Sequence, residues 1–99
     1  MDSTKQTLSY DQVRQTLSEL PEWALEDGKL VRYWTFPGFL QAMEFVEGIA
    51  QLAEREQHHP DIDIRYNRVK LALVSHDAGG ITERDAHMAR RISQAVSGP

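Results

Sequence analysis

Two of the four histidines in this chain are adjacent, in the stretch EREQHHPD at residues 54–61. Imidazole has an ordinary pKa of about 6.5, so its neutral and protonated forms both exist near neutral pH. A histidine can therefore give or take a proton, and in its neutral form it can bind zinc. Histidines gathered at one place thus indicate either proton transfer or metal binding.

A third histidine is predicted to reach this pair through a hairpin. Residues 61–66 alternate between apolar and charged side chains, and residues 69–74 continue the pattern on a returning strand. A two-residue turn at residues 67–68 places His59 opposite His76, with α-carbons about 4.5–5.5 Å apart. We therefore predict that these two imidazoles approach the same small molecule.

Proton transfer and zinc binding stay open as alternatives for His58, His59 and His76. Three protein ligands and a water form a known catalytic zinc arrangement. The sequence has no outward metal-ligand motif such as H-E-x-x-H, so a metal-free site is favoured. His87 has no partner visible in the sequence, and we expect a solvated helix residue there.

Three stretches have the apolar spacing of amphipathic helices and must help to position these residues. The first begins after Ser9, which has a capping-box partner in Gln12, and it ends at Pro21. The second is FLQAMEFVEGIAQLAERE at residues 39–56, and the third begins after Thr82.

Apolar residues of the central helix, residues 39–56, spread beyond one stripe. A monomer of 99 residues has little core in which to bury so wide a surface. A homodimer or homotetramer that covers it is expected, and a helix lying deep in the core is an equally good alternative.

Strand-forming residues fill the intervals between the helices. The stretch WALEDGKLVRYWTF at residues 23–36 surrounds Asp27-Gly28, a strong turn dipeptide, and residues 61–74 form the second hairpin. Two hairpins predict a four-stranded antiparallel sheet with the helices packed on one face. The expected fold is a single α+β domain over residues 1–99, in the order α-β-β-α-β-β-α, with residues 1–7 and 97–99 frayed.

The composition limits the partners and the location of the chain. Its formal net charge is −4, from 11 basic and 15 acidic residues, which gives no electrostatic reason to expect nucleic-acid binding. There is no cysteine, so thiolate chemistry and disulfides are excluded. Neither a signal-peptide core nor an apolar stretch of membrane-spanning length is present, so we expect a soluble, cytoplasmic protein that takes a small molecule.

The histidines belong to a longer pattern: an acid, three spacers, His-His-Pro, five spacers, an aromatic residue, nine spacers, His, eight spacers and an acid. Its members here are Glu54, His58, His59, Pro60, Tyr66, His76 and Asp85. In this pattern, and in the stretch RYNRVKLALVSHDAGGITERD, the chain resembles the pterin-4a-carbinolamine dehydratase family. The resemblance runs from about Tyr10 to Val96. It departs at Ile62, where many relatives carry tryptophan, and at Ser75, where threonine is common.

The resemblance implies a lyase, 4a-hydroxytetrahydrobiopterin dehydratase, that acts without metal or cofactor in tetrahydrobiopterin recycling. Such an enzyme removes water from a 4a-hydroxytetrahydropterin and yields the quinonoid dihydropterin. The reaction needs one proton delivered to the leaving oxygen and one removed from N5. His58 and His76 are the implied proton-transfer pair, with His59 orienting the hydroxyl, although the hairpin register equally allows His59 and His76 to be the pair.

Further residues receive roles by the same resemblance. The implied substrate-binding residues are His58, His59, Pro60, Ser75, His76, Asp77 and Ala78. Glu54 is either an exposed helix acid or an orienter of His58, which lies one helical turn later. Asp85 is a helix-start acid or a hydrogen-bond partner of His76. Tyr66 falls on the core-facing side of its strand and is expected to pack in the core.

Two other classes of function remain as alternatives. Animal members of the family also bind the dimerisation segment of a homeodomain transcription factor and act as coactivators. That activity would use the apolar helix surface, whereas a zinc hydrolase would use the three histidines. We favour the dehydratase, with homo-oligomerisation through the apolar helix.

Overall fold

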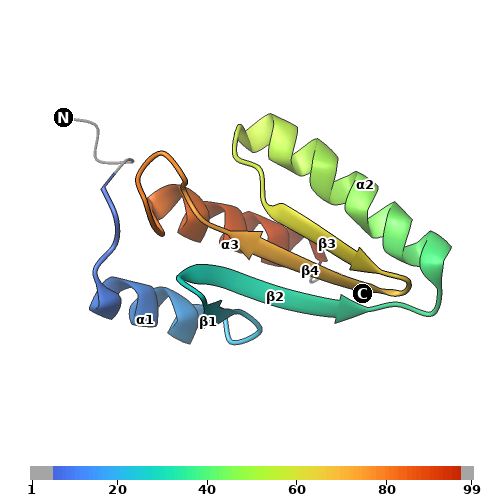
Figure 1. Ribbon diagram of the computed structural model, residues 1–99, viewed down its shortest axis with the longest axis horizontal. Helices are drawn as coiled ribbons and strands as arrows, with labels where there is room; N and C mark the ends of the chain where they lie inside the picture. The colour runs from blue at the N-terminus through green and yellow to red at the C-terminus, as the bar shows by residue number, and fades with distance from the viewer. Residues whose placement is uncertain (1–5, 97–99) are drawn as a thin grey trace.

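The computed structural model describes residues 6–96 of the chain. Its helices and strands are α1 (Tyr10–Glu19), β1 (Ala24–Glu26), β2 (Lys29–Thr35), α2 (Phe39–Glu56), β3 (Asp61–Arg65), β4 (Arg68–Leu73) and α3 (Glu83–Val96). The predicted order and the α+β class are confirmed (Figure 1). Most of the expected frayed ends, residues 1–5 and 97–99, lie outside the described residues, while Thr7 forms an antiparallel bridge with Thr82.

The four strands form one antiparallel sheet in the order β1-β2-β4-β3. Leu30 of β2 pairs with Leu73 of β4, so both side chains point to the same face of the sheet. These two residues share one buried cluster with side chains from all three helices. The helix residues of this cluster are Val13, Ala42, Ile49, Leu52, Ala53, Met88, Ala89 and Ile92. All helices therefore pack on one face, as predicted.

Local signals in the sequence account for the first helix and the first hairpin. Ser9 Oγ accepts a hydrogen bond from the N–H of Gln12 (3.1 Å), and Gln12 Oε1 accepts one from the N–H of Ser9 (2.8 Å). This is the predicted capping box, and its capping side chain contributes about 1 kcal/mol. Asp27 and Gly28 take φ values of 50° and 73°, which the predicted two-residue hairpin turn requires.

The turn between β3 and β4 lies one residue earlier than predicted. Tyr66 and Asn67 form it, and Arg65 pairs with Arg68. The Asn67 side-chain amide donates to the carbonyl of Phe36 (2.9 Å), and the Asn67 carbonyl accepts from the N–H of Phe36 (2.8 Å), which anchors Asn67 to the chain before α2. Tyr66 takes a left-handed φ of 54° and is 68% exposed, so the prediction that it packs in the core is wrong.

This turn changes the predicted histidine pairing. The ladder ends at the pair Asp61–Ala72, and His76 lies beyond β4 in the loop that leads to α3. The prediction that His59 stands opposite His76 in the ladder is therefore wrong. A register shift of two positions leaves the side chains that remain in β3 and β4 on their predicted faces of the sheet. The core-facing residues of β4 are buried as predicted: Val69, Leu71 and Leu73.

The wide apolar surface of α2 divides into a buried and an exposed part. Ile49 and Leu52 are buried in the core, whereas Phe39, Leu40 and Met43 are 48%, 72% and 38% exposed. A core position thus accounts for one side of α2 only, and self-association of the other side stays a prediction. In residues 6–96, no helix combines the length and apolar character needed to cross a membrane.

Candidate active site

A sharp end to α2 positions the two adjacent histidines. The helix ends at Glu56, and Gln57 follows in the left-handed conformation, with φ 57° and ψ 35°. The N–H groups of Gln57 and His58 both point back to the carbonyl of Ala53, the second at 3.2 Å. Pro60 is buried just before β3 begins. His58 and His59 are therefore held in a short, ordered connection between α2 and β3.

His58 contacts a fully buried carboxylate. Its Nε2 lies 2.5 Å from Oδ1 of Asp85, and the two side chains are 14% and 0% exposed. The second oxygen, Oδ2, accepts hydrogen bonds from Ser75 Oγ (2.8 Å) and from the N–H of Thr82 (2.9 Å). A buried carboxylate needs such partners because an uncompensated buried charge costs several kcal/mol.

These contacts assign the proton on the His58 ring. An ionised carboxylate only accepts hydrogen bonds, so the nitrogen that faces Asp85, Nε2, carries the hydrogen. The other nitrogen, Nδ1, is then the one that can accept a proton from a substrate. Asp85 also accepts a hydrogen bond from the N–H of Thr82 at the start of α3, and its histidine contact is with His58 and not with His76.

The contact of His59 is equally short but exposed. Its Nε2 lies 2.5 Å from Oε2 of Glu54, and the two side chains are 60% and 75% exposed. Glu54 thus contacts His59 rather than His58, the partner that helical spacing predicted. The physical reason is Gln57, whose left-handed backbone ends the helix before the i+4 position that Glu54 would face.

His76 is held by a tight turn between β4 and α3. The carbonyl of Ser75 accepts hydrogen bonds from the N–H groups of Ala78 (3.1 Å), Gly79 (3.0 Å) and Gly80 (3.3 Å). Gly79 has a φ of 79°, which favours glycine at this position. The His76 side chain is exposed, and within residues 6–96 no hydrogen bond is made to its imidazole. The His76 side chain is therefore accessible from solvent.

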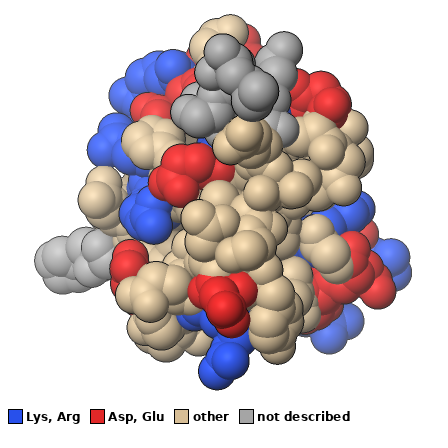
Figure 2. Space-filling view, turned by 90° about the vertical axis from the view of Figure 1, so that its left-hand side faces the viewer, with Lys and Arg blue, Asp and Glu red and all other residues tan. Residues whose placement is uncertain are grey.

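The two histidine-bearing segments lie at the same end of the sheet. Figure 1 shows the α2–β3 connection and the β4–α3 loop beside each other at the end of β3 and β4 that lies away from the β3–β4 turn. Figure 2 looks at the molecule from this side, where surface formed by residues other than Lys, Arg, Asp and Glu has acidic and basic side chains within and around it. The structure thus places the two segments that carry His58, His59 and His76 at one end of the sheet, by a route different from the predicted ladder.

Of the remaining residues singled out in the sequence, Asp77 lies in the turn that contains His76, and His87 lies outside the site. Asp77 lies in the His76 turn, where its Oδ1 accepts a hydrogen bond from Arg84 (2.7 Å). His87 lies outside the site and is an exposed residue of α3, as expected, and its Nε2 is 2.6 Å from Oε1 of Glu56. The hydrogen bond from His87 and the charge of Arg91 lower the pKa of Glu56, although some desolvation opposes them.

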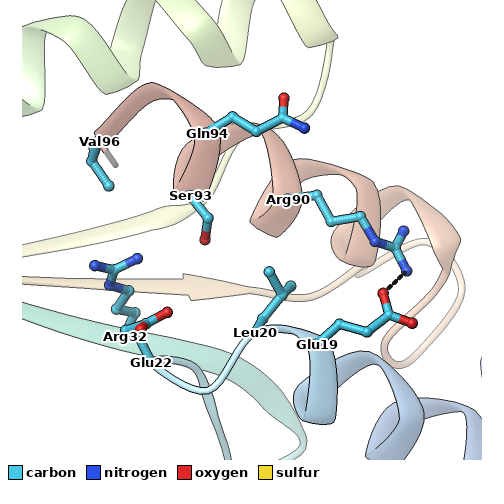
Figure 3. Close-up of a pocket in the computed structure, with 8 residues that line it drawn as sticks. All are labelled: Glu19, Leu20, Glu22, Arg32, Arg90, Ser93, Gln94 and Val96. Carbon is cyan, nitrogen blue, oxygen red and sulfur yellow. Dashed lines mark ion pairs between the residues drawn. The ribbon is translucent and has the colours of Figure 1, made fainter. Parts of the chain in front are cut away.

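Two further features of residues 6–96, the possible metal ligands and a cavity between α1, β2 and α3, do not indicate a different site for histidine chemistry. Among residues 6–96, no three His, Asp or Glu side chains are placed to hold a metal ion, which gives the zinc alternative no ligand set there. A cavity of about 520 Å³ lies between α1, β2 and α3, and Figure 3 shows the ion pair of Arg90 with Glu19 (3.7 Å) at its edge. It is lined by no histidine, so it contains none of the three candidate proton-transfer residues.

Comparison with known proteins places this geometry in a family. Residues 6–95 match the family described as pterin 4 alpha carbinolamine dehydratase. The chain is 52% identical over 81 residues to a protein of Thermomicrobium roseum named putative pterin-4-alpha-carbinolamine dehydratase, a match that covers 82% of this chain and 87% of the relative. A protein of the same name from Acidobacterium capsulatum is 54% identical over 80 residues, which cover 81% of this chain and 87% of that protein.

Solved structures agree with this match. A crystal structure described as transcriptional coactivator/pterin dehydratase from Brucella melitensis has a TM-score of 0.82 and 34% identity, and it covers 93% of this chain and 99% of that one. A pterin dehydratase-like protein described as a RuBisCO assembly factor in the alpha-carboxysome has a TM-score of 0.60 and 20% identity, over 78% and 89% of the two chains. The second likeness shows the fold alone.

Proposed function

The chain belongs to the pterin 4 alpha carbinolamine dehydratase family, and we propose that it dehydrates a 4a-hydroxytetrahydropterin with His58 and His76 as its proton-transfer pair. Family membership and the names of the relatives support the dehydratase activity. The observation that carries the histidine chemistry is the contact between His58 and the fully buried Asp85. Of the three candidate histidines, His58 has the partner best suited to fix its ring.

The reaction requires two groups in opposite protonation states. The bond between C4a and the hydroxyl oxygen breaks, and a proton added to that oxygen lets it leave as water. N5 loses its proton, and the electron pair of the N5–H bond forms the double bond between N5 and C4a. One proton is given and one is taken, so no external oxidant or reductant is needed, and proton transfer of this kind accelerates a reaction by about 10²–10⁴.

His58 is suited to take the proton from N5. With its Nε2–H donated to Asp85, its Nδ1 presents a lone pair, and the carboxylate stabilises the imidazolium that forms. His76, on the exposed turn, is suited to carry the proton that the hydroxyl needs. His59 lies next to His58 with its ring turned to Glu54, and it binds and orients the 4a-hydroxyl.

The His76 turn also supplies the proposed contacts to the polar edge of the pterin. Pterin carries donors and acceptors that backbone groups can match without a charged side chain. The Ala78 N–H is already donated to the Ser75 carbonyl, so other backbone groups of residues 75–78 would meet the ligand. Pro60, which is buried and follows His59 in the chain, is the remaining proposed substrate contact.

The setting we propose is tetrahydrobiopterin recycling in the cytoplasm, by a homodimer or homotetramer that uses no cofactor. The apolar residues of α2 that stay exposed, Phe39, Leu40 and Met43, would be covered by the association of copies. The same residues favour a second candidate, a binding role like that of a coactivator. The Brucella melitensis neighbour is named transcriptional coactivator as well as pterin dehydratase.

Stopped-flow absorbance of a 4a-carbinolamine tests the proposal. The wild-type protein should accelerate its loss, and His58→Ala or His76→Ala should remove about 10²–10⁴ of that acceleration. His87→Ala is the matched control, because it also removes a histidine beside a carboxylate but lies outside the site. No acceleration by the wild type would refute the dehydratase, and full activity of both site variants would refute the histidine mechanism alone.

A further inference from the structure

Ser75 occupies an unusual place between the two proposed proton-transfer residues. It is 1% exposed, it follows β4, and it directly precedes His76. Its hydroxyl lies 2.8 Å from Asp85 Oδ2 and 2.8 Å from Thr82 Oγ1. A buried hydroxyl with two such neighbours is not explained by apolar packing.

The directions of the hydrogen bonds around this hydroxyl are determined. Ser75 has one hydroxyl hydrogen, and an ionised carboxylate can only accept, so that hydrogen is donated to Asp85. Thr82 must then donate its own hydroxyl hydrogen to Ser75, while Thr82 Oγ1 accepts from the N–H of Arg84 (3.2 Å). The result is an ordered chain of donors that ends on the carboxylate holding His58.

The backbone of Ser75 performs a second task. Its N–H donates to the carbonyl of Gly80 (3.0 Å), and its carbonyl accepts from the N–H groups of Ala78, Gly79 and Gly80. These bonds close the turn that contains His76. The Ser75 side chain therefore bonds to the carboxylate that holds His58, and the Ser75 backbone closes the turn that contains His76.

The rigid carboxylate group transmits this restraint to His58. The two oxygens of Asp85 are fixed relative to each other, so a hydrogen bond that locates Oδ2 also locates Oδ1. Oδ2 is located by two donors, Ser75 Oγ and the N–H of Thr82. Without the Ser75 hydroxyl, the N–H of Thr82 alone would hold Oδ2, and rotation of the carboxylate would shift the acceptor that His58 faces.

We propose that Ser75 is a positioning residue for the dehydration: it holds the Asp85–His58 pair in place relative to the turn that carries His76. The inference rests on the proposed function. Ser75 itself touches no reacting atom in this scheme, and its effect on the reaction passes through the ring of His58.

The first test is Ser75→Ala, which removes the hydroxyl and leaves the backbone bonds of the turn in place. We expect kcat to fall about 10- to 100-fold, the usual cost of losing an outer partner of a functional histidine, with KM changed less than threefold. Ser75→Thr keeps the hydroxyl and should restore kcat to within threefold of wild type, whereas Ser75→Val should not. A kcat for Ser75→Ala within threefold of wild type would overturn the proposal.

A double-mutant cycle separates positioning from general damage to the fold. If Ser75 acts through His58, then Ser75→Ala should change kcat less than threefold once His58→Ala is present. An equal loss in both backgrounds would overturn the proposal. Should Ser75→Ala fail to fold, Ser75→Cys gives the same comparison, because a thiol of similar size is a much weaker donor.

Nitrogen-15 NMR of the imidazoles supplies a readout that needs no substrate. In the wild type, neutral His58 should show a single tautomer protonated at Nε2, and in Ser75→Ala its nitrogen signals should shift toward a mixture of tautomers. Unchanged His58 signals would overturn the positioning role even if the protein is inactive on pterins. A changed tautomer in a protein without dehydratase activity would instead refute the proposed function and leave the coupling of Ser75 to His58 standing.

Discussion

His58 and His59 are neighbours in the chain, and each has a carboxylate oxygen 2.5 Å from its Nε2, yet the two pairs are built differently. The His58–Asp85 pair is 14% and 0% exposed, whereas the His59–Glu54 pair is 60% and 75% exposed. Water competes for the second pair and screens it, so its contribution to stability is about 0–1 kcal/mol. Breaking the first pair from one side leaves a buried charge.

The surroundings of the two carboxylates add to this difference. Asp85 is held by Ser75 and Thr82 in addition to His58, while the Glu54 carboxylate, at the end of a long and exposed side chain, contacts only His59 among the hydrogen bonds and ion pairs of residues 6–96. A histidine ring is therefore oriented firmly at position 58 and loosely at position 59. Equal distances in a structure do not imply equal function, because burial and additional donors decide how strongly a ring is held.

The strongest way to break this comparison is to alter Asp85. Asp85→Ala should lower the free energy of unfolding by about 3–5 kcal/mol, because His58, Ser75 and Thr82 all lose a buried partner. Asp85→Asn keeps the shape but offers a donor, which favours the wrong tautomer of His58 and should lower kcat by about 10²–10⁴. Urea unfolding and stopped-flow kinetics measure the two effects.

Glu54→Gln is the matched control for Asp85→Asn, since it makes the same chemical change in the exposed pair. Its free energy of unfolding should stay within about 0.5 kcal/mol of the wild type, in line with exposed ion pairs. If the two amide variants lose equal stability and equal activity, burial is not what distinguishes the pairs.

Removing the rings themselves gives the second comparison. His58→Ala should destabilise the protein by about 1–3 kcal/mol, because Asp85 then keeps a buried oxygen without its partner. His59→Ala removes an exposed side chain and should change stability by less than about 0.5 kcal/mol. Thermal unfolding of both variants at neutral pH measures the difference. A larger loss for His59→Ala would show that the exposed pair, and not the buried one, supports the fold.

The fold could be predicted from the sequence because its signals are local. The capping box at Ser9 and Gln12 and the turn at Asp27-Gly28 each depend on residues within a few positions, and both are present in the structure. The predicted turn between β3 and β4 was misplaced by one residue, which shifts the pairing register by two positions. The predicted alternation of buried and exposed side chains still holds, because a shift of two positions does not change the face on which a side chain lies. Local rules therefore sufficed for the elements and for most of the core, but not for Tyr66, which is exposed.

The site was predictable in its members but not in its contacts. The partners of His58 and His59 depend on the left-handed backbone of Gln57, and a glutamine carries no strong signal for that conformation. The position of the β3–β4 turn depends on Asn67 bonding to Phe36, which is 31 residues earlier in the chain. The capping-type spacing of Thr82 and Asp85 did point to the carboxylate, but the Ser75 hydroxyl had no pattern to mark it.

Salt should affect the stability contributions of the two histidine–carboxylate pairs differently, and this effect is expected to be smaller than those above. Screening should act on the exposed His59–Glu54 pair and leave the buried pair nearly unaffected, because the Debye length falls to about 3 Å at 1 M salt. We expect the small stability difference between the wild type and Glu54→Gln to vanish in 1 M sodium chloride, and that of Asp85→Asn to persist. Thermal unfolding without denaturant, at low and at high salt, measures both stability differences. If the stability difference between Asp85→Asn and the wild type also vanished in high salt, it would contradict the assigned burial of the His58–Asp85 pair.

The smallest expected effect concerns the third histidine–carboxylate pair, His87 with Glu56, which links α3 to α2 outside the site. The pKa of Glu56 is lowered from its ordinary value of 4.5, chiefly by the hydrogen bond from His87. A lowered pKa means that Glu56 adds stability above about pH 4.5 and that this contribution disappears as the pH falls through its folded-state value. Glu56→Gln should therefore lower Tm slightly at pH 7, and the gap to the wild type should close below pH 4.5. Glu44 is an exposed acid on the same helix, and Glu44→Gln should show no such difference in Tm from the wild type. If the Tm difference between Glu56→Gln and the wild type grew larger in acid, Glu56 would not stabilise the protein in its ionised form.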